Sequence, residues 1–473
     1  MLKLRRFLTF LILCAILATC SQAASLTESI DAILNDPALK YGAQGVAVRS
    51  IKTGQTLYQR NADALMIPAS NFKLLVSATI LELLGPDFTF ETRVFTTGKL
   101  INGILDGDLI IKGGGDPVLR TSNLTDLAKQ VKATGINVIK GDIIADDTLF
   151  DRQRLASGWS WDSLQYYYSA EVSALNLNRN TVDVFVYPGK EVGDEAEVKL
   201  APETSYFTIE SSATTGAPDS SNTIWVSRTL GQNHIRVSGS IAKGTKVTSR
   251  ETLRSVMEPQ LYAAHAFAGE LAKQNVKFSG KIVSAKQPEE AKLVAIHKSP
   301  SLSTILSLLN KPSDNLIADV LLKYLGAHAK GLGSFGNGAD VEREFFKRIG
   351  MDLDGISISD GSGLSRFDYI SANNLIVLLS YMHSSEHSKV YIESLPIAGV
   401  DGSLYSRMRN TSAKGNVHAK TGYIGRVSSL SGYVNTKSGE PLVFSIIMNH
   451  HLCPKSDATR LQDKICVLLA DLP

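Results

Sequence analysis

The pattern of hydrophobic and polar positions predicts strands near both ends of the chain and helices between them. Residues 45–51 and 55–60 alternate apolar and polar positions around the turn Lys52-Thr53-Gly54, which is typical of a β-hairpin. A capping box at its start predicts a helix at 25–39. Residues 74–85 are apolar on nearly every side and end at a glycine, which predicts a buried helix. Further strands are predicted at 418–420, 427–435 and 441–449, followed by a helix at 456–470.

The middle of the chain, residues 88–294, has a different pattern. Short β-type runs alternate there with clusters of Gly, Pro, Ser and Thr, and helical periodicity is confined to 124–133 and 259–274. We interpret this part as an insertion, with two nested domains, in an α+β catalytic domain made of 24–87 and 295–473. Helical patterns return after the insertion at 301–310, 316–326, 340–349 and 371–383.

The first residues have the features of an export signal. Basic residues precede an apolar run at 7–18, and small residues follow at Ser21 and Ala23. We therefore exclude residues 1–23 from the mature chain and expect an exported protein of the periplasm or cell envelope. The apolar run is shorter than the about 20 residues of a membrane-spanning helix, so we expect no transmembrane helix in the mature chain. Residues 17–20 faintly resemble a lipoprotein box, but the threonine before the cysteine fits it poorly, which leaves a lipid anchor as a minor alternative.

Charge excludes one class of partner. The full chain has a net charge of +3, and removal of the signal takes away Lys3, Arg5 and Arg6 and no acidic residue. A mature chain near neutrality has no general field that attracts nucleic acid, so we expect no nucleic-acid partner.

Two cysteines, Cys453 and Cys466, remain after the signal. In an oxidising compartment they either form a disulfide between the last strand and the last helix or stay separate buried thiols. Their spacing does not decide between these alternatives, because it does not show whether the two Cβ atoms meet.

Ser70 lies just before the predicted buried helix, and Lys73 follows three residues later. This spacing puts both side chains on one face of a helix. A serine hydroxyl at a helix N-terminus, close to free backbone N–H groups and to an amine that can serve as its base, forms an activated nucleophile. Ser240 with Lys243 has the same spacing in a β-rich polar run, so the spacing alone does not identify a catalytic serine.

Two further patterns complete a set with Ser70 and Lys73. β-Lactamases and penicillin-binding proteins combine Ser-x-x-Lys with Ser-Asp-Asn and Lys-Thr-Gly. This chain has Ser313 with Asn315, in a predicted interhelix loop, and then Lys420-Thr421-Gly422 in a predicted strand. Rival matches lie in other contexts or out of order, namely Ser220, Ser371 and Lys52-Thr53-Gly54.

Each residue of the set has a task in acyl transfer to a serine. A free lysine has a pKa of about 10.4, so Lys73 can act as the base only if burial and the charge of Lys420 lower its pKa. Ser313 would relay a proton to the leaving nitrogen, and the amide of Asn315 would hold the scissile peptide.

Two further groups would bind the charged atoms of the substrate. The oxyanion needs two preorganised backbone donors, which we assign to the N–H groups of Ser70 and of Tyr423, just after Gly422. The hydroxyl of Thr421 and the charge of Lys420 would bind a terminal carboxylate.

The chain resembles the class C low-molecular-mass penicillin-binding proteins, the serine-type D-alanyl-D-alanine carboxypeptidase and endopeptidase family. The resemblance covers essentially the whole mature chain and rests on six strings in order. They are Pro68-Ala69-Ser70-Asn71-Phe72-Lys73, Gly113-Gly114-Gly115-Asp116-Pro117, Ser313-Asp314-Asn315-Leu316-Ile317-Ala318-Asp319, Asp360-Gly361-Ser362-Gly363-Leu364-Ser365-Arg366, Ala398-Gly399-Val400-Asp401-Gly402-Ser403-Leu404 and Ala419-Lys420-Thr421-Gly422.

The resemblance implies a penicillin-binding transpeptidase or β-lactamase-like domain, an antiparallel sheet with helices on both faces, split by a large insertion after the nucleophile helix. It implies removal of terminal D-alanine, or cleavage of D-Ala crosslinks, in peptidoglycan stem peptides through a Ser70 acyl-enzyme. β-Lactam antibiotics would be covalent inhibitors, and no cofactor or metal is implied.

The resemblance also points to residues at the mouth of the site. Trp159-Ser160-Trp161-Asp162 and Tyr166-Tyr167-Tyr168 resemble the segment through which the inserted part reaches the site, so Asp162 and Tyr167 are candidate contacts for the amine-bearing end of a stem peptide. The alternative is that these aromatic residues belong to the core of the inserted part and that Asp162 caps a loop. Arg366 is a candidate of the same kind. Tyr423 departs from the family, in which many members have a small hydroxylated residue after Lys-Thr-Gly.

Two other functions compete with a DD-peptidase. A β-lactamase needs a group that activates water against the acyl-enzyme, and no Glu-x-x-Leu-Asn string of class A enzymes lies between Asn315 and Lys420. A non-hydrolytic cell-wall binding protein would keep the fold, but the complete set at 70, 73, 313, 315 and 420 argues against a dead site.

Labelled penicillin separates the three functions. We expect a long-lived covalent adduct, because penicillin acylates a DD-peptidase and the enzyme lacks the dedicated group with which a β-lactamase activates water against the penicillin adduct. Rapid turnover of the penicillin would indicate a β-lactamase, and no adduct would indicate a binding protein. The adduct is measured by labelling and gel electrophoresis of the purified protein.

Overall fold

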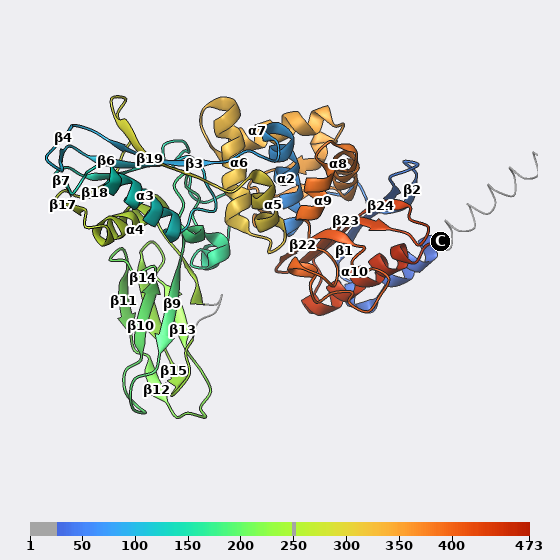
Figure 1. Cartoon of the computed structure of the whole chain (residues 1–473). Coiled ribbons are helices and arrows are strands. Elements are labelled where there is room, and N and C mark those ends of the chain that lie inside the picture. Colours follow the sequence, from blue (N-terminus) through green and yellow to red (C-terminus); the bar gives the residue numbers. More distant parts are fainter. Residues whose placement is uncertain (1–25, 248–251) are drawn as a thin grey trace, which may run out of the picture.

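The computed structural model describes residues 26–247 and 252–473, and the signal predicted at 1–23 lies outside this range. Figure 1 shows one body formed by both ends of the described chain and a second body formed by its middle. Among the described residues, none of the helices combines the length and the apolar character needed to cross a membrane.

A five-stranded antiparallel sheet joins the two ends of the described chain. Its order is β2-β1-β24-β23-β22, so β1 from the beginning pairs with β24 from the end. The predicted sheet closed by both chain ends is therefore confirmed. The strands are β1 (Ala43–Ser50), β2 (Thr56–Arg60), β22 (His418–Ile424), β23 (Val427–Asn435) and β24 (Pro441–Asn449).

The side chains of this sheet alternate between two separate hydrophobic cores. Along β24, Phe444 and Ile446 pack with α10 (Lys455–Ala470) and with the helical residues 26–34. Val443 belongs to the core on the opposite face, which the other helices of this body build. Because successive strand residues point to opposite faces, a β24 that is apolar at almost every position requires helices on both sides of the sheet.

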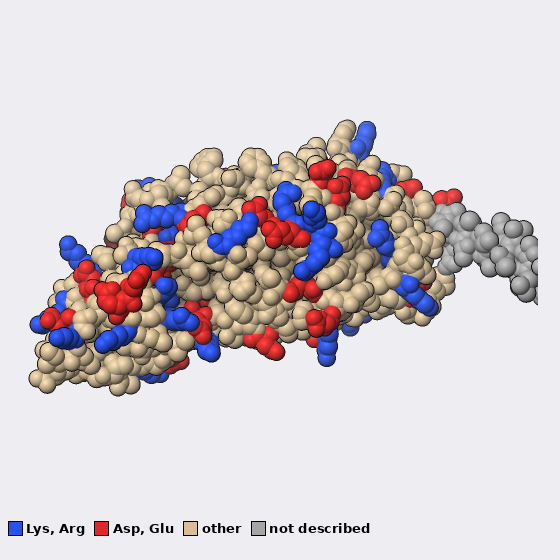
Figure 2. All heavy atoms as spheres, turned by 90° about the horizontal axis from the view of Figure 1, so that it is seen from above, with Lys and Arg blue, Asp and Glu red and all other residues tan. Residues whose placement is uncertain are grey.

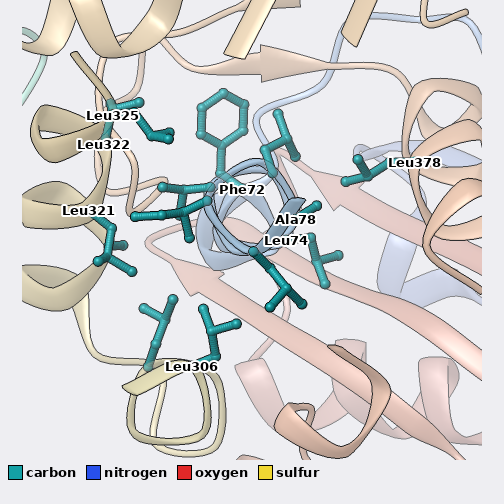
Figure 3. Close-up of a cluster of buried hydrophobic side chains, with 14 of the residues drawn as sticks. Phe72, Leu74, Ala78, Leu306, Leu321, Leu322, Leu325 and Leu378 are labelled. Carbon is teal, nitrogen blue, oxygen red and sulfur yellow. The ribbon is translucent and has the colours of Figure 1, made fainter. Parts of the chain in front are cut away.

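The helix after Ser70 is the centre of the larger core. α2 (Lys73–Leu84) follows the 3-10 turn η2 (Ala69–Phe72), and its residues from Lys73 to Leu81 are all buried. Figure 3 shows Phe72, Leu74 and Ala78 of this segment surrounded by leucines of neighbouring helices. The labelled leucines belong to α5 (Leu302–Asn310), α6 (Asn315–Lys330) and α8 (Ala372–Ser384). The same core also includes residues of α7 (Phe335–Arg348), α9 (Ser388–Ser394), β20 (Ile356–Ser357) and β21 (Tyr369–Ile370).

The inserted part begins with two mixed sheets and two helices, whose hydrophobic core is continuous with residues of the small sheets described below. One sheet has the order β18-β8-β6-β3-β19 and the other β17-β7-β5-β4. The elements are β3 (Glu91–Thr96), β4 (Lys99–Ile101), β5 (Ile104–Asp106), β6 (Leu109–Gly113), α3 (Thr121–Ala133), β7 (Val138–Ile139), β8 (Ile143–Asp146), α4 (Pro259–Lys273), β17 (Lys277–Phe278), β18 (Ile282–Ser284) and β19 (Lys292–Lys298).

Three small sheets make up the rest of the inserted part, drawn green in Figure 1 and lying below α3 and α4. The chain enters this group after β8 and returns to α4, so it is nested in sequence within the preceding sheets. Its strands are β9 (Thr181–Tyr187), β10 (Glu197–Ala201), β11 (Thr208–Ser211), β12 (Thr214–Gly216), β13 (Trp225–Arg228), β14 (His234–Ser238), β15 (Ser240–Ala242) and β16 (Arg254–Ser255).

Two details differ from the sequence-based expectations, and one open question is decided. The first described helix ends at residue 34, because the chain turns at Asp36 into a 3-10 turn that starts with Pro37; Ser25, the first residue of the predicted capping box, lies outside the described residues. β19 runs through the boundary predicted at residue 294 and pairs with β3 as far as Lys298. The question that the sequence left open at Cys453 and Cys466 is decided for separate thiols, of which Cys466 is a buried core residue of α10 and Cys453 is only partly buried.

The surface carries both signs of charge. In Figure 2, Lys and Arg side chains alternate with Asp and Glu side chains over the visible face, and no extended area of one sign stands out. This mixture agrees with the nearly neutral mature chain, because charges of opposite sign cancel over short distances.

Two leucines of α2 test the importance of its buried faces. Leu81 is fully buried and Leu83 is 45% exposed, although both belong to the last turn of the same helix. We expect Leu81→Ala to destabilise the protein by about 2–5 kcal/mol and Leu83→Ala by less than about 0.5 kcal/mol. The free energy of unfolding of each variant is measured by urea denaturation, with the fraction of protein that still binds penicillin as the signal. Equal losses of stability in the two variants would contradict the central position of α2.

Candidate active site

Ser70 is held against the edge of the sheet by the turn that precedes α2. Ser429 Oγ of β23 donates a hydrogen bond of 2.6 Å to the carbonyl of Pro68, which fixes the start of η2. Ala69 has a positive φ of 47°, so the backbone turns sharply just before the serine. Ser70 itself is half-buried and lies three residues before Lys73, as predicted, although its turn is 3-10 rather than α-helical.

Lys73 is fully buried and its Nζ has three polar neighbours. It lies 3.0 Å from Ser70 Oγ, and it donates to Asn315 Oδ1 at 2.7 Å and to the carbonyl of Ser362 at 2.5 Å. A neutral amine has two hydrogens and one lone pair. Because Asn315 and Ser362 present only oxygens that accept, they take the two hydrogens and leave the lone pair facing the Ser70 hydroxyl.

Burial lowers the pKa of Lys73 from 10.5 to about 8. The carboxylates of Asp319, Asp360, Asp314 and Asp368 act in the opposite direction and favour the ammonium form. Burial dominates because the removal of an ammonium group from water costs more than carboxylates at this distance return. Asp319 itself has a pKa well above its usual range, through burial and the nearby Asp360, which weakens its attraction for the lysine charge.

Lys420 and Ser313 form a second buried pair beside the first. Lys420 Nζ of β22 donates to Ser313 Oγ at 2.7 Å and to the carbonyl of Thr421 at 2.9 Å. Burial, and then the charge of Lys73, hold the pKa of Lys420 well below its usual range. Lys73 therefore disfavours the charged form of Lys420, whereas the lowered pKa of Lys73 comes from burial and not from the charge of Lys420 that the sequence-based hypothesis invoked.

Both polar atoms of the Asn315 side-chain amide make hydrogen bonds within the protein. Its oxygen accepts from Lys73, and its Nδ2 donates at 2.8 Å to the carbonyl of Tyr168 in the inserted part. The amide orientation is thus set by partners in two different parts of the chain. A substrate peptide can hydrogen bond to Asn315 Nδ2 only by replacing or sharing the Tyr168 carbonyl.

A cavity of about 730 Å³ opens above Ser70. Of the residues predicted from sequence, the ones that line it are Ser70, Ser313, Asn315, Thr421, Tyr423, Asp162, Tyr167 and Arg366. Lys73 and Lys420 lie fully buried behind its wall, and Gly422 lies so close to Ser70 that a Cβ added to it would come 3.0 Å from Ser70 N. All of the predicted site residues are therefore brought to one place.

The residues that line the cavity include both acidic and basic side chains. Asp162 belongs to the turn η3 (Trp161–Ser163) of the inserted part, and its Oδ1 accepts at 2.5 Å from Ser160 Oγ. Arg366 donates at 3.0 Å to the carbonyl of Gly425, after β22. Tyr167 opens the turn η4 (Tyr167–Ser169) and packs edge-on against Tyr168. The cavity therefore offers opposite charges for a substrate with both an amine and a carboxylate.

Three contributors were missed as functional residues by sequence reasoning. Ser362 supplies the carbonyl for Lys73, and Ser403 Oγ lies 2.6 Å from Thr421 Oγ1 in the cavity. Both lie in strings that carried the family resemblance, and this was the available signal. Lys455 Nζ lies 4.5 Å from the ring centre of the exposed Tyr423, and nothing in the sequence near α10 indicated it.

The rival motifs lie away from this cavity. Ser240 belongs to β15, and Lys243 pairs with Glu191 at 2.9 Å. Ser371 caps the N-terminus of α8 by accepting from Asn374 N. Over 26–247 and 252–473, there is no group of three or more His, Cys, Asp and Glu side chains arranged to hold a metal ion.

Comparisons with known proteins agree with this geometry. The model of the D-Ala-D-Ala carboxypeptidase 3 (S13) family matches residues 26–472. The chain is 38% identical over 469 residues to a D-alanyl-D-alanine carboxypeptidase of Actinomadura sp. (strain R39), covering 96% of this chain and 86% of that protein.

Solved structures show the same similarity. The structure of penicillin binding protein 4 (dacB) from Haemophilus influenzae has a TM-score of 0.83 and 25% identity, covering 93% of this chain and 99% of that chain. The same protein complexed with a β-lactam has a TM-score of 0.75 and 25% identity, covering 92% of this chain and 97% of that chain.

Two glycines that follow the same Lys-Thr dipeptide test the packing behind Ser70. A Cβ at Gly422 would lie 2.8 Å from the carbonyl oxygen of Pro68 and 3.0 Å from Ser70 N, whereas a Cβ at Gly54 would meet nothing within 4 Å. We expect Gly422→Ala to displace η2 and to slow penicillin acylation by roughly 100-fold. Gly54→Ala should keep the acylation rate and cost about 1–2 kcal/mol of stability, because its φ is +72°. Rapid-quench labelling measures the rates, and equal rates would contradict this contact.

Proposed function

The chain belongs to the D-Ala-D-Ala carboxypeptidase 3 (S13) family, and we propose that it works as a serine DD-peptidase through an acyl-enzyme at Ser70. Its substrates are peptidoglycan stem peptides, from which it removes the terminal D-alanine or whose D-Ala crosslinks it cleaves. This substrate agrees with the export signal at 1–23 and with an envelope or periplasmic location. The single observation that carries the assignment of Ser70 is the position of Lys73 Nζ, 3.0 Å from its hydroxyl and held by two acceptors.

Acylation begins when neutral Lys73 takes the proton of the Ser70 hydroxyl. The serine oxygen attacks the carbonyl carbon of the penultimate D-alanine, and the resulting oxyanion is stabilised by the N–H groups of Ser70 and Tyr423. The peptide bond then breaks, and Ser313 passes a proton to the leaving nitrogen. The proton that Lys73 took from Ser70 returns to Ser313 through Lys420, which is hydrogen-bonded to Ser313 at 2.7 Å, so that Lys73 is neutral again before deacylation.

Deacylation regenerates the enzyme. A water molecule attacks the acyl carbon, Lys73 accepts a proton from it, and the Ser70 oxygen leaves and is protonated. A β-lactam follows the same first step, but its leaving nitrogen stays attached to the acyl group. This supports covalent inhibition, in line with the H. influenzae penicillin binding protein 4 that was solved with a β-lactam.

Substrate orientation follows from the charges at the cavity. The terminal carboxylate of a carboxypeptidase substrate binds near the hydroxyls of Thr421 and Ser403, which are 2.6 Å apart. Asp162 and Arg366, which both line the cavity, receive the charged groups of the stem residue before the D-alanines, beside the Tyr167 ring. The exposed Tyr423 narrows the cavity at the position where many relatives have a smaller side chain.

Muropeptide digestion tests the proposed reaction. We expect the purified protein to release D-alanine from pentapeptide muropeptides, to split crosslinked dimers, or to do both, as measured by mass spectrometry before and after digestion. Ser70→Ala should abolish product and penicillin adduct together. Ser240→Ala, the matched serine of the rival motif, should leave both unchanged, and an adduct that persists in Ser70→Ala would refute the nucleophile.

The pH dependence of acylation reports on Lys73. The pKa of this lysine is lowered to about 8, so the amine is protonated and inactive as a base below that pH. We expect the acylation rate constant to rise with pH and to reach a plateau above about 8. Stopped-flow measurement with a chromogenic β-lactam between pH 6 and 10 tests this, and a flat profile would contradict a lysine base.

A further inference from the structure

We propose that Arg179, in the inserted part, is a positioning residue for acylation that acts through Asp314, the middle residue of the Ser313-Asp314-Asn315 motif. The inference rests on the proposed function, because it assigns a cause to the arrangement of Ser313 and Asn315 at the same site. Neither Arg179 nor Asp314 has a role in the mechanism above.

An unusual backbone turn presents Arg179 to the catalytic domain. The three residues of η5 (Asn178–Asn180) all have positive φ, 49° at Asn178, 62° at Arg179 and 51° at Asn180. Asparagine tolerates this region, but arginine does so poorly. Side-chain amides hold the turn, since Asn180 Oδ1 accepts from Leu177 N at 2.9 Å and its Nδ2 donates to the carbonyl of Glu171 at 2.8 Å. A residue kept in a strained conformation by its surroundings indicates a use for its side chain.

The Arg179 side chain bridges the inserted part and the motif. Its Nε donates to Asp314 Oδ2 at 2.8 Å, and its Nη1 donates to the carbonyl of Pro117 at 2.8 Å. Both side chains of the ion pair are largely covered, with 24% exposed for Arg179 and 20% for Asp314. Pro117 is the last residue of the Gly113-Gly114-Gly115-Asp116-Pro117 string. Its carbonyl helps to fix the orientation of the Arg179 guanidinium group.

Asp314 transmits this restraint to both of its neighbours. Its Oδ1 accepts from Ile317 N at 3.0 Å and caps α6, so its two oxygens are divided between the helix and Arg179. Ser313, just before it, has a positive φ of 64°, a backbone conformation that serine keeps only when its surroundings hold it there. Asn315, just after it, holds Lys73. A rotation of Asp314 would therefore move the Ser313 hydroxyl and the Asn315 amide together.

The ion pair also affects the charge seen by Lys73. Asp314 is among the carboxylates that raise the pKa of this lysine, and Arg179 offsets its charge. Loss of Arg179 alone leaves the negative charge of Asp314 unneutralised, so the pKa of Lys73 should rise. Loss of the Asp314 charge removes one of the carboxylates that raise this pKa, so the pKa of Lys73 should fall. The other charged groups that face Lys73 are Asp319 of α6, Asp360 and Asp368 of the loop before β21, and Lys420 of β22.

A double-mutant cycle tests the inference on the full-length enzyme. Arg179→Gln removes the charge and shortens the side chain, so that it lacks the Nη1 that donates to Pro117, and Asp314→Asn keeps a good helix cap without the charge. We expect Arg179→Gln to slow acylation by a labelled penicillin by roughly 10- to 100-fold, since small displacements of catalytic groups have effects of that size. The double variant should be no slower than the slower single variant, because both changes break the same contact. Arg179→Lys should recover part of the rate.

Two further measurements separate positioning from general stability. The pH at which the acylation rate is half-maximal should move upward in Arg179→Gln and downward in Asp314→Asn. The matched control is Arg236→Gln, which removes an exposed ion pair with Glu210 in the same inserted part and should change neither rate nor pH profile. Melting temperatures are compared for all variants. If Arg179→Gln does not fold, the inference is tested by two other measurements. They are the downward shift of the half-maximal pH in Asp314→Asn and the acylation rate of Arg179→Lys.

Several outcomes would overturn the inference. They are an unchanged acylation rate in Arg179→Gln, losses that add fully in the double variant, or a half-maximal pH that stays fixed in both single variants. These results are distinct from failure of the proposed function, in which the unmodified protein would form no Ser70 adduct and would leave muropeptides intact.

Discussion

The buried amine of Lys73 is the constraint on which the rest of the site depends. An ammonium group in this position would be expensive to bury, and its pKa is accordingly lowered to about 8. The Asn315 amide oxygen and the Ser362 carbonyl fix two of the three directions around the nitrogen and leave the third for Ser70. The neighbouring elements must hold these oxygens in place, because a displaced acceptor would turn the lone pair away from the serine.

The loop that carries Ser362 is itself held in place by several hydrogen bonds. The Asp360 carboxylate is fully buried and accepts from the backbone N–H groups of Ser362, Gly363 and Ser365. It also accepts at 2.8 Å from the indole N–H of Trp159, which belongs to the inserted part. Together with the Tyr168 carbonyl on Asn315 and Arg179 on Asp314, this makes three contacts from the insertion to groups beside the nucleophile. The insertion therefore helps to hold the groups of the candidate site, in addition to the Asp162 and Tyr167 that it contributes to the cavity.

The local sequence predicted helices and strands best where a single hydrophobic periodicity extends over a whole segment. The antiparallel sheet and the helices after residue 300 follow from runs of uniform pattern, and the fold class is confirmed. The sequence was less informative where a turn of the backbone decides where a helix begins or ends, or whether two side chains meet. Pro37 shortens the first helix, and η2 replaces the first α-helical turn at Ser70. Cys453 and Cys466 stay apart, because α10 turns Cys466 into the core beside the sheet while Cys453 lies near His451.

The sequence by itself determined the residue types of the candidate site and their order, since Ser70, Lys73, Ser313, Asn315 and Lys420 each have a task in the proposed acyl transfer and lie in recognisable local contexts. Only the tertiary structure decided which partner holds each of them. The Ser362 carbonyl, the Tyr168 carbonyl and the Arg179 guanidinium act through single hydrogen bonds between segments far apart in the chain. Backbone carbonyls are present at every residue, so no sequence pattern marks the ones that face Lys73 and Asn315. Their roles arise when packing brings them within about 3 Å of a buried polar group that needs a partner.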